Sequence, residues 1–89
     1  MGSINYRVKI MPTSPSADLK KIKEEARKTI EHGGGKGCIF EEEPIAFGLK
    51  AVIVTFIFPE EDSLDSVEER LGKNNEVNSV QIIDMRRAL

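Results

Sequence analysis

Apolar and polar side chains alternate along residues 4–10, near the start of the chain. A period of two residues is typical of a β-strand with one buried face. The apolar positions are Ile4, Tyr6, Val8 and Ile10. This segment therefore predicts a strand that contributes one face to a core.

The period lengthens to three and four residues after this strand, as in a helix with one apolar stripe. The stripe consists of Leu19, Ile22, Ala26 and Ile30. Ser14 and Pro15 fit a helix start, since serine caps free N–H groups and proline at the first position loses no hydrogen bond. The glycines of "HGGGKG" are typical of a helix end. We therefore expect an amphipathic helix that begins at Pro15.

Two strands joined by a turn are predicted next, over about residues 38–43 and 49–58. The turn runs from Pro44 to Gly48, and proline and glycine are typical turn residues. The second strand is rich in β-branched and aromatic residues and is apolar on both faces over much of its length. It should therefore lie in the middle of a sheet.

A second helix and a last strand complete the pattern. Asp62 or Ser63 is the expected helix cap, and the inward stripe comprises Leu64, Val67 and Leu71. The last strand should span residue 77 to about 87. Its adjacent Ile82 and Ile83 interrupt strict alternation, which predicts a β-bulge.

The predicted order is βαββαβ, in one domain over residues 1–89. Two right-handed crossovers around a central hairpin give a ferredoxin-like α+β fold. It has a four-stranded antiparallel sheet in the order 4-1-3-2 and both helices on one face. Phe47 and Arg87 should then lie at opposite ends of the sheet, on the order of 30 Å apart.

Composition narrows the function classes. The net charge of −2 gives no global attraction to nucleic acid or to an anionic membrane. A single cysteine, Cys38, excludes an internal disulfide, and no apolar run approaches the ~20 residues of a membrane span. We expect a monomer in the cytoplasm, with no membrane contact.

No cofactor, metal or catalytic motif is predicted. "GGGKG" follows a helix, and its lysine precedes glycine rather than the serine or threonine of a phosphate-binding loop. Cys38 lacks a C-x-x-C partner. The acidic runs at 41–43 and 60–62 lack the alternating ligands of a calcium loop.

An RNA-binding module is the alternative function, because RNA-recognition domains share the βαββαβ order. "IAFGLKAV" contains the Phe-Gly pair of their third-strand motif. However, Leu49 and Val52 occupy the positions of the stacking aromatics. Without aromatic rings on the open sheet face, direct nucleic-acid binding is not expected.

Phe47 has two possible roles. It could fold back to plug the hairpin, with Ala51, Ile53 and Ile57 shielded by long neighbouring side chains. It could instead be an exposed anchor for another protein, as aromatic residues at interfaces often are. The residues alone leave both interpretations open.

The segments "MPTSPSADL", "EEEPIAFGLKAVIV" and "VNSVQIIDMRRAL" together resemble archaeal translation elongation factor 1-beta over essentially the whole chain. The resemblance implies a guanine-nucleotide exchange factor that promotes GDP release from elongation factor 1-alpha, with no covalent chemistry and hence no enzyme activity. It also implies a bridge whose two ends contact two domains of that partner.

The resemblance implies which residues bind the partner. The family's turn aromatic matches Phe47, and its Gly-Ile-Lys matches Gly48 to Lys50. Eukaryotic members carry a penultimate lysine that enters the magnesium and phosphate site, whereas this chain has Ala88 there. We expect Arg86 or Arg87 to take that part, the alternative being that both arginines only pair with surface carboxylates.

Overall fold

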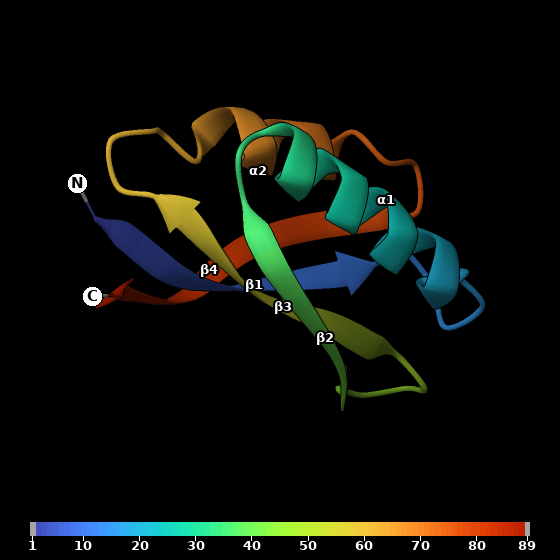
Figure 1. The fold of residues 1–89 in the computed structure, drawn as a ribbon. Helices are drawn as coiled ribbons and strands as arrows, with labels where there is room; N and C mark the ends of the chain where they lie inside the picture. Colours follow the sequence, from blue (N-terminus) through green and yellow to red (C-terminus); the bar gives the residue numbers. More distant parts are fainter. Residues whose placement is uncertain (1, 89) are drawn as a thin grey trace.

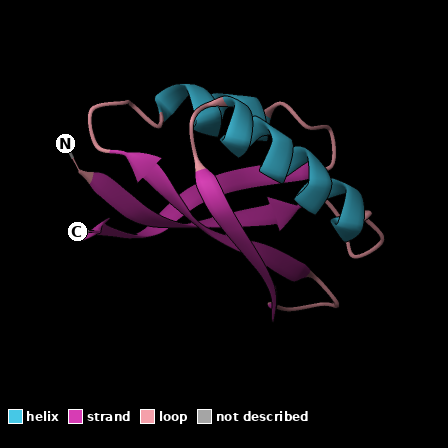
Figure 2. Ribbon diagram, viewed as in Figure 1, coloured by secondary structure: helices cyan, strands magenta, loops and turns pink. Residues whose placement is uncertain are grey.

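A computed structural model describes residues 2–88 as a sheet covered on one face by two helices (Figures 1 and 2). The order βαββαβ is confirmed. The strands are β1 (Ser3–Pro12), β2 (Lys36–Pro44), β3 (Lys50–Pro59) and β4 (Val77–Ala88), and the helices are α1 (Leu19–His32) and α2 (Asp65–Gly72). No helix within residues 2–88 is long and apolar enough to cross a membrane.

The sheet has the order β2-β3-β1-β4 with every neighbouring pair antiparallel, so the predicted ferredoxin-like topology is confirmed. The ends of the sheet are also arranged as expected. The loop before α1 is bonded to the loop after α2, since the Thr13 N–H donates to the Glu76 carbonyl at 2.9 Å. At the other end, the Glu60 N–H donates to the Gly2 carbonyl at 3.0 Å.

The core lies between the sheet and the helix layer. The predicted stripes of both helices face it, with Ile22, Ala26 and Ile30 buried in α1. Leu19, at the first turn of α1, is only partly buried. The strands contribute alternate residues, namely Tyr6, Val8, Ile10, Val52, Val54, Phe56 and Phe58.

Helix α1 begins later than predicted, and the Ser14–Pro15 start was wrong. Asp18 is the N-cap, and its Oδ1 accepts a hydrogen bond from the Lys21 N–H at 3.1 Å. Residues 14–17 form a separate turn, in which the Ala17 N–H donates to the Ser14 carbonyl at 3.2 Å. The Asp18 N–H also donates to Glu76 Oε2 at 2.8 Å, a contact that fixes the helix start from another part of the chain.

The start of α2 also differs by one or two residues from the prediction. Its N-cap is Leu64, not Asp62 or Ser63. The Ser63 hydroxyl still accepts a hydrogen bond from the Asp65 N–H, at 3.2 Å. Ser63 therefore supplies a local bond next to the cap without occupying the cap position.

The predicted bulge in β4 is confirmed. Val8 pairs with Ile82 and Arg7 pairs with Asp84, so Ile83 is an extra residue with no partner of its own on β1. Residues 84–88 beyond the bulge pair regularly with β1, and a second register shift lies between Met11 and Pro12, near the start of β4.

Long side chains cover the helix-free face of β3. Arg7 on β1 reaches Glu41 on β2 at 3.6 Å, and Lys9 reaches Glu43 at 3.9 Å. Both ion pairs cross β3, which lies between those strands. Ile53 beneath them is only 2% exposed.

The neighbouring apolar residues on this face of β3 are also covered. Ala51 is buried as well, and Ile57 is partly buried. The shielding of the central strand, which was one of the two interpretations that the sequence left open, is thus observed, and this face offers no apolar patch over β3.

Candidate functional site

The turn between β2 and β3 holds Phe47 at its tip. The Leu49 N–H donates to the Ala46 carbonyl at 2.9 Å, and the Ile45 N–H donates to the Leu49 carbonyl at 2.8 Å. Phe47 and Gly48 are the two central residues, with φ of 55° and 80°. Positive φ at both central positions is the pattern of a type I′ hairpin turn.

Phe47 is an unusual residue for that position. It is the only non-glycine residue of the described chain at positive φ, a conformation that costs about 1–2 kcal/mol for a residue with a Cβ. Its side chain is nevertheless 95% exposed, so no packing within the domain offsets this cost. The hairpin-plug interpretation is wrong, and the ring is free for another molecule.

Gly48 lies against the loop before α1. A Cβ at Gly48 would be 3.6 Å from the Pro15 Cβ, an ordinary contact, so space does not exclude a side chain there. Its φ of 80° is the constraint, since glycine adopts this conformation without strain. Gly48 thus shapes the turn that presents Phe47.

Lys50 begins β3 directly after the turn and is exposed. It forms no ion pair with a carboxylate of residues 2–88, unlike Lys23, whose Nζ lies 2.6 Å from Glu42 Oε2. The Lys23 hydrogen bond and charge lower the pKa of Glu42, and the charge of Lys50 lowers it further. The ammonium of Lys50 is therefore near a carboxylate yet available to a partner.

Arg86 and Arg87 lie near the end of β4, on opposite faces of the sheet. Arg86 is paired with Asn5 and Arg87 with Ile4, which are adjacent positions of β1. Arg86 Nε is 3.2 Å from Asp84 Oδ2, and Arg87 forms an ion pair with Glu60 in the loop after β3.

The ion pairs of these arginines are solvent-exposed. The Arg86 side chain is 80% exposed and that of Arg87 is 68% exposed. Exposed pairs of this kind contribute less than about 1 kcal/mol, so a partner could replace them.

The structure does not bring the predicted site residues together. Phe47, Gly48 and Lys50 lie at one end of β3, and both arginines lie at the other end of the sheet, next to the N-terminal residues (Figure 1). The molecule is elongated, measuring 42 × 20 × 17 Å. Such a shape suits contacts at two separate points better than a single cleft.

Two exposed apolar side chains beside these residues were not predicted. Ile45 flanks the Phe47 turn, and Met85 precedes Arg86. Met85 pairs with the buried Tyr6, so alternation places it on the covered face of the sheet, yet it is exposed. The helix layer does not extend over this end of the sheet, so Met85 is left in solvent. The only indication in the sequence is that the predicted second helix is short.

The open sheet face lacks an RNA platform. Tyr6, Phe56 and Phe58 pack together in the core, with centroids 5.7–6.3 Å apart. Phe40 is on the helix side as well, packed against the core and beneath Arg27 at 5.4 Å. Within residues 2–88 no group of three or more histidine, cysteine or acidic residues could hold a metal ion.

Comparison with known proteins gives a consistent result. Residues 5–88 match the family described as "EF-1 guanine nucleotide exchange domain". Proteins named elongation factor 1-beta are similar over almost their whole length. That of Methanosarcina barkeri is 42% identical, with 98% of this chain and 99% of the relative covered, and that of Methanosphaera stadtmanae is 37% identical, with 100% of both covered.

Solved structures with low sequence identity share the fold. LarC2, the C-terminal domain of a cyclometallase, has a TM-score of 0.68 at 8% identity, covering 100% of this chain and 58% of that one. BlrP1 BLUF has a TM-score of 0.59 at 12% identity, covering 99% of this chain and 56% of that one. At these identities the likeness concerns the architecture alone.

Proposed function

Because this chain belongs to the family of EF-1 guanine nucleotide exchange domains, we propose that it promotes GDP release from translation elongation factor 1-alpha by contacting that protein with both ends of its sheet. The observation that carries this proposal is the conformation of Phe47. A bulky residue held at positive φ and left 95% exposed costs stability and gives nothing back within the domain. Such strain is typical of functional positions.

The Phe47 end supplies affinity. An exposed aromatic ring on a rigid hairpin can enter a pocket of the partner with little loss of conformational entropy. Ile45 adds apolar surface beside it, and Lys50 adds a positive charge without an ion pair of its own among residues 2–88. Gly48 keeps the turn in the geometry that presents the ring.

The arginine end supplies the displacement of the nucleotide. A GTPase holds GDP through phosphate contacts and a magnesium ion. A guanidinium can bind a phosphate or a magnesium-coordinating carboxylate through two hydrogen bonds, and either contact weakens the grip on GDP. Arg86 and Arg87 point to opposite faces, so one of them reaches the site and the other does not.

No covalent step is needed for exchange. A factor that binds the nucleotide-free partner better than the GDP-bound partner shifts the equilibrium toward release. Each 1.4 kcal/mol of that difference changes the equilibrium about tenfold. The exchange mechanism therefore needs no cofactor and no enzyme chemistry. We further propose that the protein acts as a cytoplasmic monomer without direct contact with nucleic acid.

The test is the release of fluorescent GDP from elongation factor 1-alpha, measured with and without this protein. Acceleration that saturates with protein concentration supports the proposal, and an unchanged rate contradicts it. A gel-shift assay with single-stranded RNA tests the alternative, and no shift is expected because Tyr6, Phe56 and Phe58 lie in the core rather than on the open sheet face.

Three variants test which residue displaces the nucleotide. They are Arg86→Ala, Arg87→Ala and a deletion of residues 87–89. At least one should still bind the partner, by calorimetry, while losing most of the acceleration. If all three variants accelerate GDP release as much as the unchanged protein does, the residue that displaces the nucleotide lies elsewhere in the domain.

A further inference from the structure

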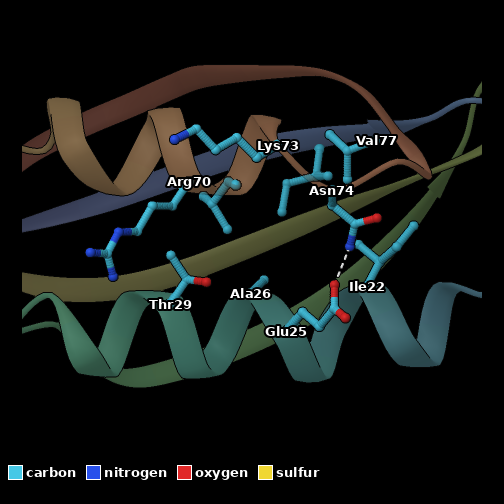
Figure 3. Close-up of a pocket in the computed structure, with 10 residues that line it drawn as sticks. Ile22, Glu25, Ala26, Thr29, Arg70, Lys73, Asn74 and Val77 are labelled. Atoms are coloured by element: carbon cyan, nitrogen blue, oxygen red, sulfur yellow. Dashed lines mark hydrogen bonds between the residues drawn. The ribbon is translucent and has the colours of Figure 1, made fainter.

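A cleft of about 220 Å³ opens in the helix layer, between α1, the last turn of α2 and the loop that follows α2 (Figure 3). Its apolar lining includes Ile22, Ala26, Leu71 and Val77. Its polar lining includes Glu25, Thr29, Arg70, Lys73 and Asn74. It is separate from the Phe47 turn and from Arg86 and Arg87, none of which lines it.

The size of the cleft limits what it can hold. Pockets for drug-sized ligands usually measure about 300–1,000 Å³, so a nucleotide or a cofactor is too large for this one. A single phenylalanine or leucine side chain is the right size. Leu71, which is 6% exposed, and the partly buried Val77 would meet it at the floor, whereas Ile22 and Ala26 beneath are almost fully covered by the core.

Positively charged side chains outnumber carboxylates at the rim of the cleft. Figure 3 shows Arg70 and Lys73 extending toward the same side of the cleft, with Thr29 of α1 below them. Arg70 forms no ion pair with a carboxylate of residues 2–88. Lys73 lies 3.8 Å from Glu69, and both side chains are 72% exposed, so this pair is weak.

The only carboxylate that lines the cleft among residues 2–88 is engaged. Glu25 accepts a hydrogen bond from the Asn74 side chain, on the side away from the Arg70 guanidinium in Figure 3. One side of the rim is therefore cationic, since Arg70 has no ion pair among residues 2–88 and Lys73 has only a weak, exposed one, and it is next to an apolar floor. An occupant needs an apolar side chain and a nearby negative charge.

We propose that this cleft anchors a segment of a partner protein in which a phenylalanine-sized side chain stands beside a carboxylate. The ring fills the mouth of the cleft between α1 and the end of α2, and the carboxylate binds Arg70 and Lys73. Burial of one aromatic anchor flanked by a charge is a common arrangement at interface hot spots. This contact is additional to nucleotide exchange and does not depend on it.

Three capped dipeptides test the proposal with ¹⁵N-labelled protein in NMR titrations. The first is acetyl-Phe-Glu-amide, which carries both groups. The second replaces Glu by Gln and the third replaces Phe by Ala. The first peptide should shift the amide signals of Ala26, Leu71 and Asn74 saturably, and each replacement should weaken binding about tenfold.

Two protein variants test whether Arg70 binds the carboxylate of the peptide. Arg70→Gln should bring the affinities of the Glu and Gln peptides close together while keeping the preference for Phe over Ala. Lys20→Gln, on the side of α1 that faces Phe40, is the matched control and should change nothing. Both replaced side chains are exposed, so the fold should survive.

Three results would overturn the proposal. The peptides could shift signals elsewhere on the protein, or all three could bind equally. The cleft signals could instead move with protein concentration alone, which would identify the occupant as a second copy of this chain.

Discussion

Replacing Phe47 by alanine is expected to leave the fold nearly as stable as before while weakening the contact with elongation factor 1-alpha. A phenylalanine side chain that is 95% exposed has only about 10 Å² covered, if a full ring buries roughly 200 Å². At about 25 cal/mol per Å², removing it costs ~0.25 kcal/mol. Phe56, which is 1% exposed, should lose about 3–5 kcal/mol when changed to alanine.

A second substitution at this position sharpens the prediction. Phe47→Gly removes a positive-φ cost of about 1–2 kcal/mol. The greater conformational freedom of glycine in the unfolded chain lowers the free energy of unfolding by about 0.5–1 kcal/mol. The glycine variant should therefore be slightly more stable than the natural protein, by ~0.5–1 kcal/mol, although it also lacks the ring.

Both variants should bind the partner about 1–3 kcal/mol less tightly, as for a modest hot spot. This corresponds to a roughly 5- to 150-fold higher concentration for half-maximal acceleration of GDP release. Urea denaturation gives the stability, and a GDP-release titration gives the affinity. Ile39→Ala is the control, because Ile39 is also highly exposed but lies on the edge strand β2.

Two results would refute this reasoning. A loss of more than ~2 kcal/mol of stability on Phe47→Ala would mean that the ring packs within the domain. Normal half-maximal concentrations for both variants would mean that the turn does not contact the partner.

Three further predictions concern the domain itself. Ile22→Ala should lower the free energy of unfolding by about 2–5 kcal/mol, more than Leu19→Ala at the partly buried end of the stripe, and a loss below ~0.5 kcal/mol would place the helix elsewhere. The hydrogen bond from Lys23 lowers the pKa of Glu42 below its ordinary 4.5, so the stability that Glu42 adds is present above that pH and lost as the pH falls through the lowered value. The stability difference between the natural protein and Glu42→Gln should therefore shrink between pH 7 and about pH 3, and a constant difference would contradict the ion pair. Burial raises the pKa of the Cys38 thiol, so iodoacetamide at pH 8 should modify it more slowly in the native protein than in urea, whereas equal rates would show an open thiol.

Periodic features of the fold were predictable because each depends on neighbours along the chain. Alternation identified β1, and the adjacent Ile82 and Ile83 indicated the bulge. The start of α1 was not predictable. Ser14 and Asp18 are both good caps, and the choice is made by a hydrogen bond from Asp18 to Glu76, 58 residues away.

The candidate site was predictable to a similar extent. Its residues could be named, and strand alternation placed Arg86 and Arg87 on opposite faces. The positive φ of Phe47 and the ion pair between Arg87 and Glu60 were not predictable, because they depend on turn geometry and on a loop 27 residues away. The cleft between the helices depends on how α1 and α2 pack, and no local pattern encodes that.

The position of β1 between β3 and β4 has a consequence for the order in which the protein forms. A ribosome synthesises β1 first and β4 last, so one edge of β1 stays unpaired until the rest of the chain has emerged. Pairing of such distant segments closes a long loop and makes folding slow relative to helical proteins. The strand that completes the sheet is also the strand that carries Arg86 and Arg87. A molecule that can present those arginines in register has therefore already assembled its sheet. If the arginines act as proposed, partly made chains cannot promote nucleotide exchange on the machinery that is producing them.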